Sequence, residues 1–175
     1  MKLLARIRPE DVDRSIVSQD CTTYRIRTAG RAVIFDSNKV ALVQVKKSGY
    51  YMLPGGGLDG DDVEAGLARE VLEELGCRIE LVRPVGVIEV YFDRWMQRQV
   101  DYCFIARKIG GDNDVVTLTD FEEDEGYETV WAPSLQNAIA LVESATPEGR
   151  DGKLVRARDL LFLQTVACTV ASWTK

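Results

Sequence analysis

The sequence predicts an α/β (α+β) fold in which a mixed β-sheet is sandwiched between helices. An amphipathic helix ends near Gly76, strand-like segments lie on both sides of it, and further helical segments follow towards the C-terminus. Elements in that order place helices on both faces of a sheet. At 175 residues, the chain suits one domain that buries about 70% of its unfolded surface. We predict a single domain over residues 1–175, with an N-terminal extension at 1–20 and an appended C-terminal helix at 153–172.

Short apolar or alternating segments, bounded by turn residues, supply the strands of this sheet. Residues 22–28 alternate between apolar and basic side chains, which is the period of a half-buried strand. Asp36-Ser37-Asn38 supplies the turn of a hairpin. The predicted strands are residues 22–28, 32–35, 40–45, 50–53, 78–92, 97–108 and 129–132. We further expect an acidic loop at 110–128 and helices at 135–143 and from 154 onwards.

Composition and charge exclude several classes of function. The net charge of −6 and the pI of about 4.8 argue against a nonspecific nucleic-acid surface, which requires a basic face. The chain has no histidine, which excludes Ser-His-Asp and Cys-His catalysis and histidine-ligated zinc. A small anionic substrate remains compatible, because a bound metal ion inverts the local charge.

The cysteines and the apolar segments indicate the compartment. Cys21, Cys77, Cys103 and Cys168 show no C-x-x-C spacing and are interpreted as buried or incidental thiols in a reducing compartment. The N-terminus lacks the long apolar segment of a signal peptide. The longest apolar stretch, 160–171, is shorter than the roughly 20 residues of a membrane span. We expect a cytoplasmic protein with no membrane partner.

Three glutamates share one face of the central helix. Glu70, Glu73 and Glu74 fall together because a helix advances about 100° per residue. Like charges one turn apart repel by roughly 0.2–0.5 kcal/mol per pair. This face is therefore either open to water, which is the usual interpretation of a charged helix face, or it holds a cation.

The residues around this helix favour the cation. Pro54 is followed by three glycines, which let the backbone come close to a ligand. Asp61 is expected to cap the helix start and Gly76 its end. Arg69 can hold one of the acids with its fork of N–H donors. Mg²⁺ takes oxygen ligands, usually one or two carboxylates together with substrate phosphate.

Residues 55–77 resemble the Nudix box of the MutT-like hydrolases, written G-x5-E-x7-R-E-U-x-E-E-x-G-U, where U is a bulky apolar residue. Residues 69–76, Arg-Glu-Val-Leu-Glu-Glu-Leu-Gly, match its second half position by position. Asp61 stands where the family has its first glutamate. The opening glycine is Gly55 by spacing, or Gly56 if the Pro-Gly-Gly sequence is aligned instead.

This resemblance implies hydrolysis of a pyrophosphate bond in a nucleoside diphosphate linked to another moiety, a small-molecule nucleotide-type substrate. It implies Mg²⁺, or Mn²⁺ as the alternative, bound by Glu70, Glu73 and Glu74, with the carbonyl of Gly55 as a further ligand. Glu73 and Glu74 are expected to be the main ligands. Glu70 shares the metal or takes the proton of the attacking water, and Arg69 orients a glutamate. The catalytic candidates are thus Glu70, Glu73 and Arg69.

Substrate contacts are expected from the acidic loop and from aromatic residues. Some family members use a further carboxylate from a loop as a base, and Glu122, Glu123, Glu125 and Glu128 are candidates here. We rank Glu122 and Glu123 above the other two glutamates as candidates for this base. The alternative is that the acidic loop is simply solvated. Tyr51, Tyr91, Trp95 and Tyr102 can stack on a base or pack in the core. We select Tyr51 and Trp95 as substrate-binding candidates.

Other interpretations remain open from the sequence. A Nudix-like domain can sense a nucleotide or sugar phosphate without cleaving it, and the glutamate face can belong to a structural helix without metal. The C-terminal helix can pack on the sheet or form a dimer contact, so the protein is a monomer or a homodimer. Lys153, Arg156 and Arg158 on that helix can also reach a substrate phosphate.

Overall fold

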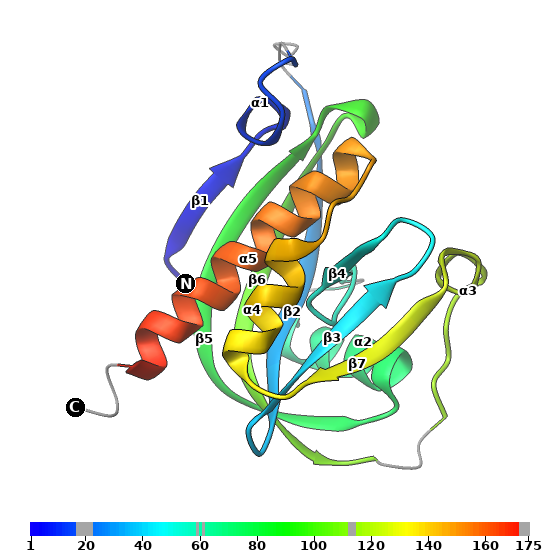
Figure 1. The fold of residues 1–175 in the computed structure, drawn as a ribbon, viewed down its shortest axis with the longest axis vertical. Helices are drawn as coiled ribbons and strands as arrows, with labels where there is room; N and C mark the ends of the chain where they lie inside the picture. The colour runs from blue at the N-terminus through cyan, green and yellow to red at the C-terminus, as the bar shows by residue number, and fades with distance from the viewer. Residues whose placement is uncertain (17–22, 59, 61, 112–114, 172–175) are drawn as a thin grey trace.

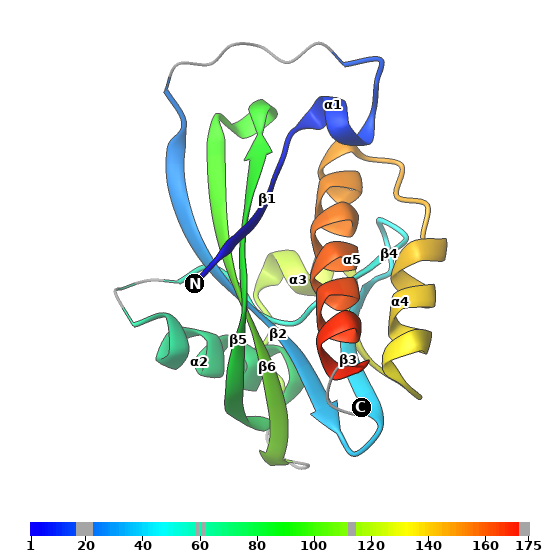
Figure 2. The ribbon, with the colours of Figure 1, turned by 90° about the vertical axis from the view of Figure 1, so that its left-hand side faces the viewer.

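A mixed β-sheet forms the centre of the structure, with α2 on one face and α4 and α5 on the other (Figures 1 and 2). The computed structural model describes residues 1–16, 23–58, 60, 62–111 and 115–171. Its strands are β1 (Leu3–Ile7), β2 (Arg25–Asp36), β3 (Lys39–Val45), β4 (Tyr50–Met52), β5 (Arg78–Phe92), β6 (Gln97–Gly110) and β7 (Tyr127–Ala132). Its helices are α1 (Pro9–Val12), α2 (Val63–Leu75), α3 (Asp120–Glu125), α4 (Leu135–Ser144) and α5 (Arg150–Ala171), and η1 (Asp93–Trp95) is a 3₁₀ turn. The predicted sandwich is confirmed.

The strand order is β1-β5-β6-β2-β3-β4, and β7 pairs with β3. β2 runs parallel to β6, whereas β5 and β6 form a long antiparallel hairpin. The register of β5 shifts near Pro84, which agrees with the long or bulged strand predicted for residues 78–92. The predicted N-terminal extension contributes the edge strand β1, parallel to β5, and the short helix α1.

The segments predicted as two strands, 22–28 and 32–35, form one strand, β2. Its pairing with β6 continues through the intervening residues without a break. A Cβ added at Gly30 would lie 3.0 Å from the Cβ of Leu67 in α2. This glycine therefore marks the close packing of α2 on the strand and not an interruption. Residue 22 lies outside the described part of the chain.

Two other predicted boundaries are wrong. The acidic loop predicted at 110–128 contains helix α3, because Thr119 and Glu122 form a capping box and Gly126 adopts a left-handed conformation at its end. The C-terminal helix begins at Arg150, a few residues before its predicted start at 153.

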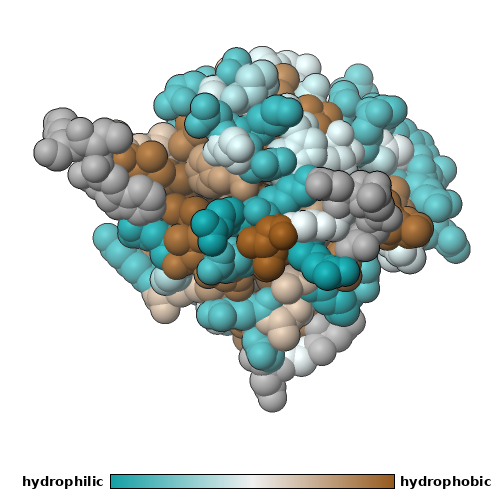
Figure 3. All heavy atoms as spheres, turned by 90° about the horizontal axis from the view of Figure 1, so that it is seen from below, coloured by the Kyte–Doolittle hydropathy of each residue, from teal (hydrophilic) through white to brown (hydrophobic). Residues whose placement is uncertain are grey.

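Two hydrophobic clusters hold the helices on the sheet. The larger lies under α4 and α5 and includes Phe162 and Leu163 of α5, and the smaller lies under α2 and includes Leu67 and Val71. Packing of the C-terminal helix on the sheet, one of the two alternatives, is thus observed. None of the helices in the described ranges is long and apolar enough to cross a membrane. Seen from below, hydrophilic side chains separate the exposed hydrophobic patches (Figure 3).

Candidate active site

The site is built where β2 and β3 separate. These strands pair only at the hairpin end, so most of that edge of β2 is free for another segment. Residues 54–58 occupy it, with Gly30 N–H donating to the carbonyl of Gly56 at 3.0 Å and Leu58 N–H donating to that of Thr28 at 3.0 Å. This glycine loop is thereby held beside α2.

Two glycines of the loop allow α2 to come this close. Gly55 has a φ of +118°, a region that side chains rarely adopt, and a Cβ there would collide with the carbonyl oxygen of Gly30. A Cβ at Gly56 would collide with the carboxylate of Glu70. The glycines therefore bring the backbone within reach of the acidic side chains of α2.

The helix itself is capped at both ends. Asp62 accepts hydrogen bonds from the N–H groups of Glu64 and Ala65, at 3.0 and 3.1 Å. Asp61, which we predicted as the cap, lies outside the described residues. Gly76 ends the helix in the left-handed conformation, as predicted.

The three glutamates of α2 have different surroundings. Glu74 is only 6% exposed, and its Oε2 accepts the N–H of Gly55 at 2.7 Å. The side chain of Glu70 is 15% exposed and pairs with Arg69 at 2.6 Å. Glu73 is 42% exposed and pairs with the same arginine at 2.8 Å. Glu70 and Glu74 line a cleft, whereas Glu73 lies outside its lining.

Burial makes the two α2 glutamates that line the cleft hard to ionise. Burial raises the pKa of Glu74 to about 8, against the lowering effects of the Gly55 hydrogen bond and Arg31, and Glu122 and Glu70 add to the rise. Burial also raises the pKa of Glu70, although Arg69 opposes this. A cation placed between these carboxylates would favour their ionised forms.

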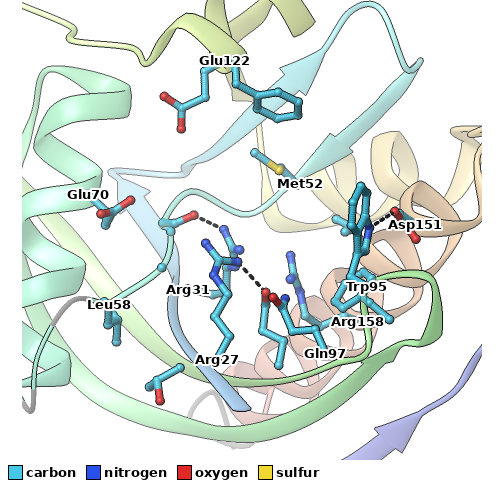
Figure 4. Close-up of a pocket in the computed structure, with 18 of the residues that line it drawn as sticks. Arg27, Arg31, Met52, Leu58, Glu70, Trp95, Gln97, Glu122, Asp151 and Arg158 are labelled. Atoms are coloured by element: carbon cyan, nitrogen blue, oxygen red, sulfur yellow. Dashed lines mark hydrogen bonds between the residues drawn. The ribbon is translucent and has the colours of Figure 1, made fainter. Parts of the chain in front are cut away.

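The cleft has a volume of about 770 Å³, with an acidic end at α2 and a basic floor on β2 beside it. Figure 4 shows Glu70 on α2 and Glu122 on α3 facing the same space as Arg27 and Arg31. Trp95 of η1 lies at the rim. Its ring N–H donates to Asp151 at 2.8 Å, which orients the ring.

The basic floor comes from matching positions on β2 and β6. Arg25, Arg27 and Arg31 are at odd-numbered positions, so they point to one face of the extended strand. Arg25 pairs in register with Gln97 and Arg27 with Gln99, and Arg27 donates to Gln99 Oε1 at 2.6 Å. We missed this stripe in the sequence because we divided β2 into two strands. The alternation of arginines was the available signal.

A buried network ties this floor to α5. Asp101 accepts from Arg31 at 3.2 Å and from Arg158 at 3.1 Å. Arg158 also donates twice to Asp159, at 2.7 and 3.0 Å, and Asp159 accepts the N–H of Leu53 at 3.0 Å. Arg31 in turn donates to the carbonyl of Gly55. The C-terminal helix thus holds both the arginine floor and the start of the glycine loop.

A sequence profile of the NUDIX domain matches residues 25–150, most of the chain. The chain belongs to the NUDIX family. The predicted Nudix hydrolase is thereby confirmed, and the glycine loop and α2 together form its Nudix box. A search among curated proteins gave no match.

Solved Nudix structures share this fold. A Nudix hydrolase from Nitrosomonas europaea has a TM-score of 0.61 at 20% identity, covering 85% of this chain and 90% of that chain. A MutT Nudix hydrolase from Burkholderia pseudomallei has a TM-score of 0.55 at 22% identity, covering 81% and 98%. A UDP-X diphosphatase has a TM-score of 0.54 at 16% identity, covering 91% and 70%. At these identities, the likeness concerns the fold.

The remaining predicted site residues fall into two groups around the Nudix box. Gly55, Trp95 and Glu122 line the cleft. Tyr51 packs against the larger hydrophobic cluster, and Glu123 is exposed outside the cleft lining. Within the described ranges, no three acidic or cysteine side chains are gathered closely enough to hold a metal ion.

Proposed function

We propose that this Nudix protein hydrolyses a pyrophosphate bond in a nucleoside diphosphate linked to another moiety, with the help of a divalent metal ion. The observation that carries this proposal is the polarity of the cleft. Glu70 and Glu74 form an acidic end beside the glycine loop, and Arg27 and Arg31 form a basic floor. A pyrophosphate bridge is anionic, so both a metal held by the carboxylates and nearby guanidiniums would stabilise it. One protein of similar fold is named a UDP-X diphosphatase, which supports this reaction class.

The residues present fit one hard divalent cation, for which we propose Mg²⁺ with Mn²⁺ as the alternative. Glu70 and Glu74 offer carboxylate oxygens, and two such groups are the usual number for protein-bound Mg²⁺. The carbonyl of Gly55 keeps one lone pair besides its bond to Arg31. When bound, the ion would neutralise charge on the bridge and lower the pKa of a bound water.

The neighbouring residues orient these ligands. Arg69 donates to both Glu70 and Glu73, so it fixes their positions relative to each other. We assign Glu73 an outer place in the acidic cluster, because it is more exposed and outside the cleft lining. Its contribution should therefore be smaller than that of Glu70 or Glu74.

Glu122 is the carboxylate that we propose as the base. It faces the cleft from α3, and its Oε2 accepts the N–H of Thr119 at 2.8 Å, which leaves Oε1 to take a proton. Glu70 is the alternative, since it lines the same end of the cleft. Glu123, one residue further along α3, points away from the lining.

Trp95 is the residue that we propose to stack on the base of the substrate. It is 60% exposed at the rim, and its bond to Asp151 holds the ring in one orientation. Tyr51 packs against the core instead, so we assign it no stacking role.

The test is release of phosphate or nucleoside monophosphate from a panel of nucleoside diphosphate derivatives, with Mg²⁺ and with EDTA. We expect metal-dependent turnover that Glu70→Gln and Glu74→Gln abolish and Glu73→Gln reduces less. Glu64→Gln is the matched control, because Glu64 lies exposed in the first turn of the same helix. Turnover retained in both Glu70→Gln and Glu74→Gln would refute the assignment. Tight nucleotide binding without turnover would indicate a sensor domain instead.

A further inference from the structure

We propose that Arg27, supported by Arg31, forms a phosphate subsite in the cleft that binds without metal. This inference rests on the proposed function for its role in the reaction, because the bound phosphate would belong to the substrate. The acidic end would hold the metal, whereas Arg27 would take a phosphate group that the metal does not bind.

Arg27 has no directly paired carboxylate among the described residues. In the described part of the chain, its side chain makes one hydrogen bond, to the neutral Gln99, and no ion pair. The side chain is half-buried in the cleft, where an unpaired charge is costly. Burial lowers the pKa of Arg27, and the adjacent Arg31 lowers it further, against the raising effects of Asp101 and Glu70. An anion bound here would remove this cost.

The buried carboxylates near Arg27 are already paired with other arginines. Arg31 and Arg158 share the carboxylates Asp101 and Asp159. Both carboxylates are thus paired with other guanidiniums, and Asp101 and Glu70 act on Arg27 without a direct ion pair to it. Arg31 is also engaged with the carbonyl of Gly55, so we interpret it as a positioning residue beside Arg27.

The position of Arg27 suits the binding of a substrate phosphate next to the pyrophosphate bond that is hydrolysed. Its guanidinium lies against Gly57, where an added Cβ would collide with it, and Glu70 lies against the preceding Gly56 in the same way. The carboxylate of Glu70 and the guanidinium of Arg27 thus lie against adjacent residues of the glycine loop. Figure 4 shows both side chains at the cleft. A guanidinium fork matches the oxygens of a phosphate. Arg25, exposed at the outer end of the same stripe, extends the positive charge towards solvent.

The test is titration of the full chain with inorganic phosphate in EDTA, at constant ionic strength, by calorimetry. We expect saturable binding by the wild type, weakened about tenfold or more in Arg27→Gln, as expected for the loss of charge-assisted hydrogen bonds. Arg27→Lys should keep part of the affinity, because it keeps the charge but loses the fork. Arg107→Gln is the matched control, since Arg107 pairs with Glu80 on the surface at the other end of the sheet.

Two further measurements keep the inference falsifiable. In EDTA, the wild type should melt at a higher temperature in phosphate than in chloride. This measurement does not depend on whether the variants fold. Acetate should bind more weakly than phosphate. The absence of saturable phosphate binding, equal affinity in Arg27→Gln and Arg107→Gln, or acetate binding as tight as phosphate would overturn the proposal.

The outcomes separate this subsite from the proposed function. Glu70→Gln should lose metal-dependent turnover and still bind phosphate in EDTA. In turnover assays, Arg27→Gln should raise KM more than it lowers kcat. Phosphate binding without any hydrolysis would refute the proposed enzyme activity but not the phosphate subsite. Hydrolysis with an unchanged KM in Arg27→Gln would refute the phosphate subsite but not the proposed enzyme activity.

Discussion

At the scale of single residues, the approach of the glycine loop to α2 determines how the acidic end is arranged. The N–H of Gly55 donates to Glu74, and a Cβ added at Gly56 would collide with the carboxylate of Glu70. Any side chain at residue 56 must displace the carboxylate of Glu70. The position of Glu70, one of the two proposed ligands, therefore depends on the absence of a side chain at residue 56.

We predict that Gly56→Ala loses metal-dependent turnover but keeps nearly the stability of the wild type. The new methyl group would enter the space of the Glu70 carboxylate, which is the end of a flexible side chain and can move aside at little cost. Gly149→Ala is the control, because a Cβ there meets nothing within 4 Å. The measurements are turnover and urea unfolding; full activity in Gly56→Ala would contradict the geometry.

A second residue-scale prediction concerns pH. Burial raises the pKa of Glu74 from its ordinary 4.5 to about 8, so between these values the folded state binds the proton more tightly than the unfolded state. In EDTA, the contribution of Glu74 to the free energy of unfolding should fall as pH rises from 4.5 to 8. Metal affinity should rise over the same range, because the ligand must be deprotonated.

The measurement is urea unfolding of the wild type and Glu74→Gln across this pH range in EDTA. The difference in the free energy of unfolding between the two proteins should shift in favour of Glu74→Gln as pH rises. A difference that stays constant with pH would show that the carboxyl ionises normally in the folded protein.

At the scale of elements, α5 reaches the site at two places: Asp151 holds the ring of Trp95, and a buried dipeptide holds the floor of the cleft. Arg158 and Asp159 connect this helix to Asp101 under the arginine floor and to Leu53 before the glycine loop. Both side chains of the dipeptide are almost completely buried. The family profile ends at residue 150, so this connection comes from a helix outside the matched region.

We predict that Arg158→Met destabilises the protein by about 3–5 kcal/mol, because it leaves two buried carboxylates short of a partner. Lys153→Met, on the same helix, should cost no more than about 1 kcal/mol, because its pair with Asp13 is partly exposed. Urea unfolding checks both values. Equal losses in the two variants would mean that the buried network contributes no more than a surface pair.

At the scale of the whole molecule, α5 is part of the core. Four of its side chains are completely buried in the larger cluster: Leu154, Phe162, Leu163 and Val166. Each such burial contributes roughly 1.5–3 kcal/mol. Together they are comparable with the total stability of a domain, about 5–15 kcal/mol.

We therefore predict that deleting residues 150–171 abolishes cooperative folding, although the family profile covers only residues 25–150. The check is near-ultraviolet circular dichroism and thermal unfolding, compared with the full chain. A cooperative transition in the shortened chain would show that α5 is dispensable for the fold.

The sequence by itself determined the family, the sandwich and the end of α2 at Gly76, because these depend on local features. The spacing of Arg69, Glu70 and Glu74 and the left-handed glycine after the helix belong to one contiguous stretch. Hydrophobic periodicity likewise located most strands to within a few residues. Where a glycine served tertiary packing, as at Gly30, the local pattern was misinterpreted.

Only the tertiary structure decided which of the predicted residues meet in one cleft. Glu73 and Glu74 are adjacent in sequence, yet one is exposed beside Arg69 and the other is buried against Gly55. Arg27 and Arg158 are far apart in sequence, and both line the same cleft. The physical reason is that burial and the balance of charges depend on which strands and helices pack together, which no single segment specifies.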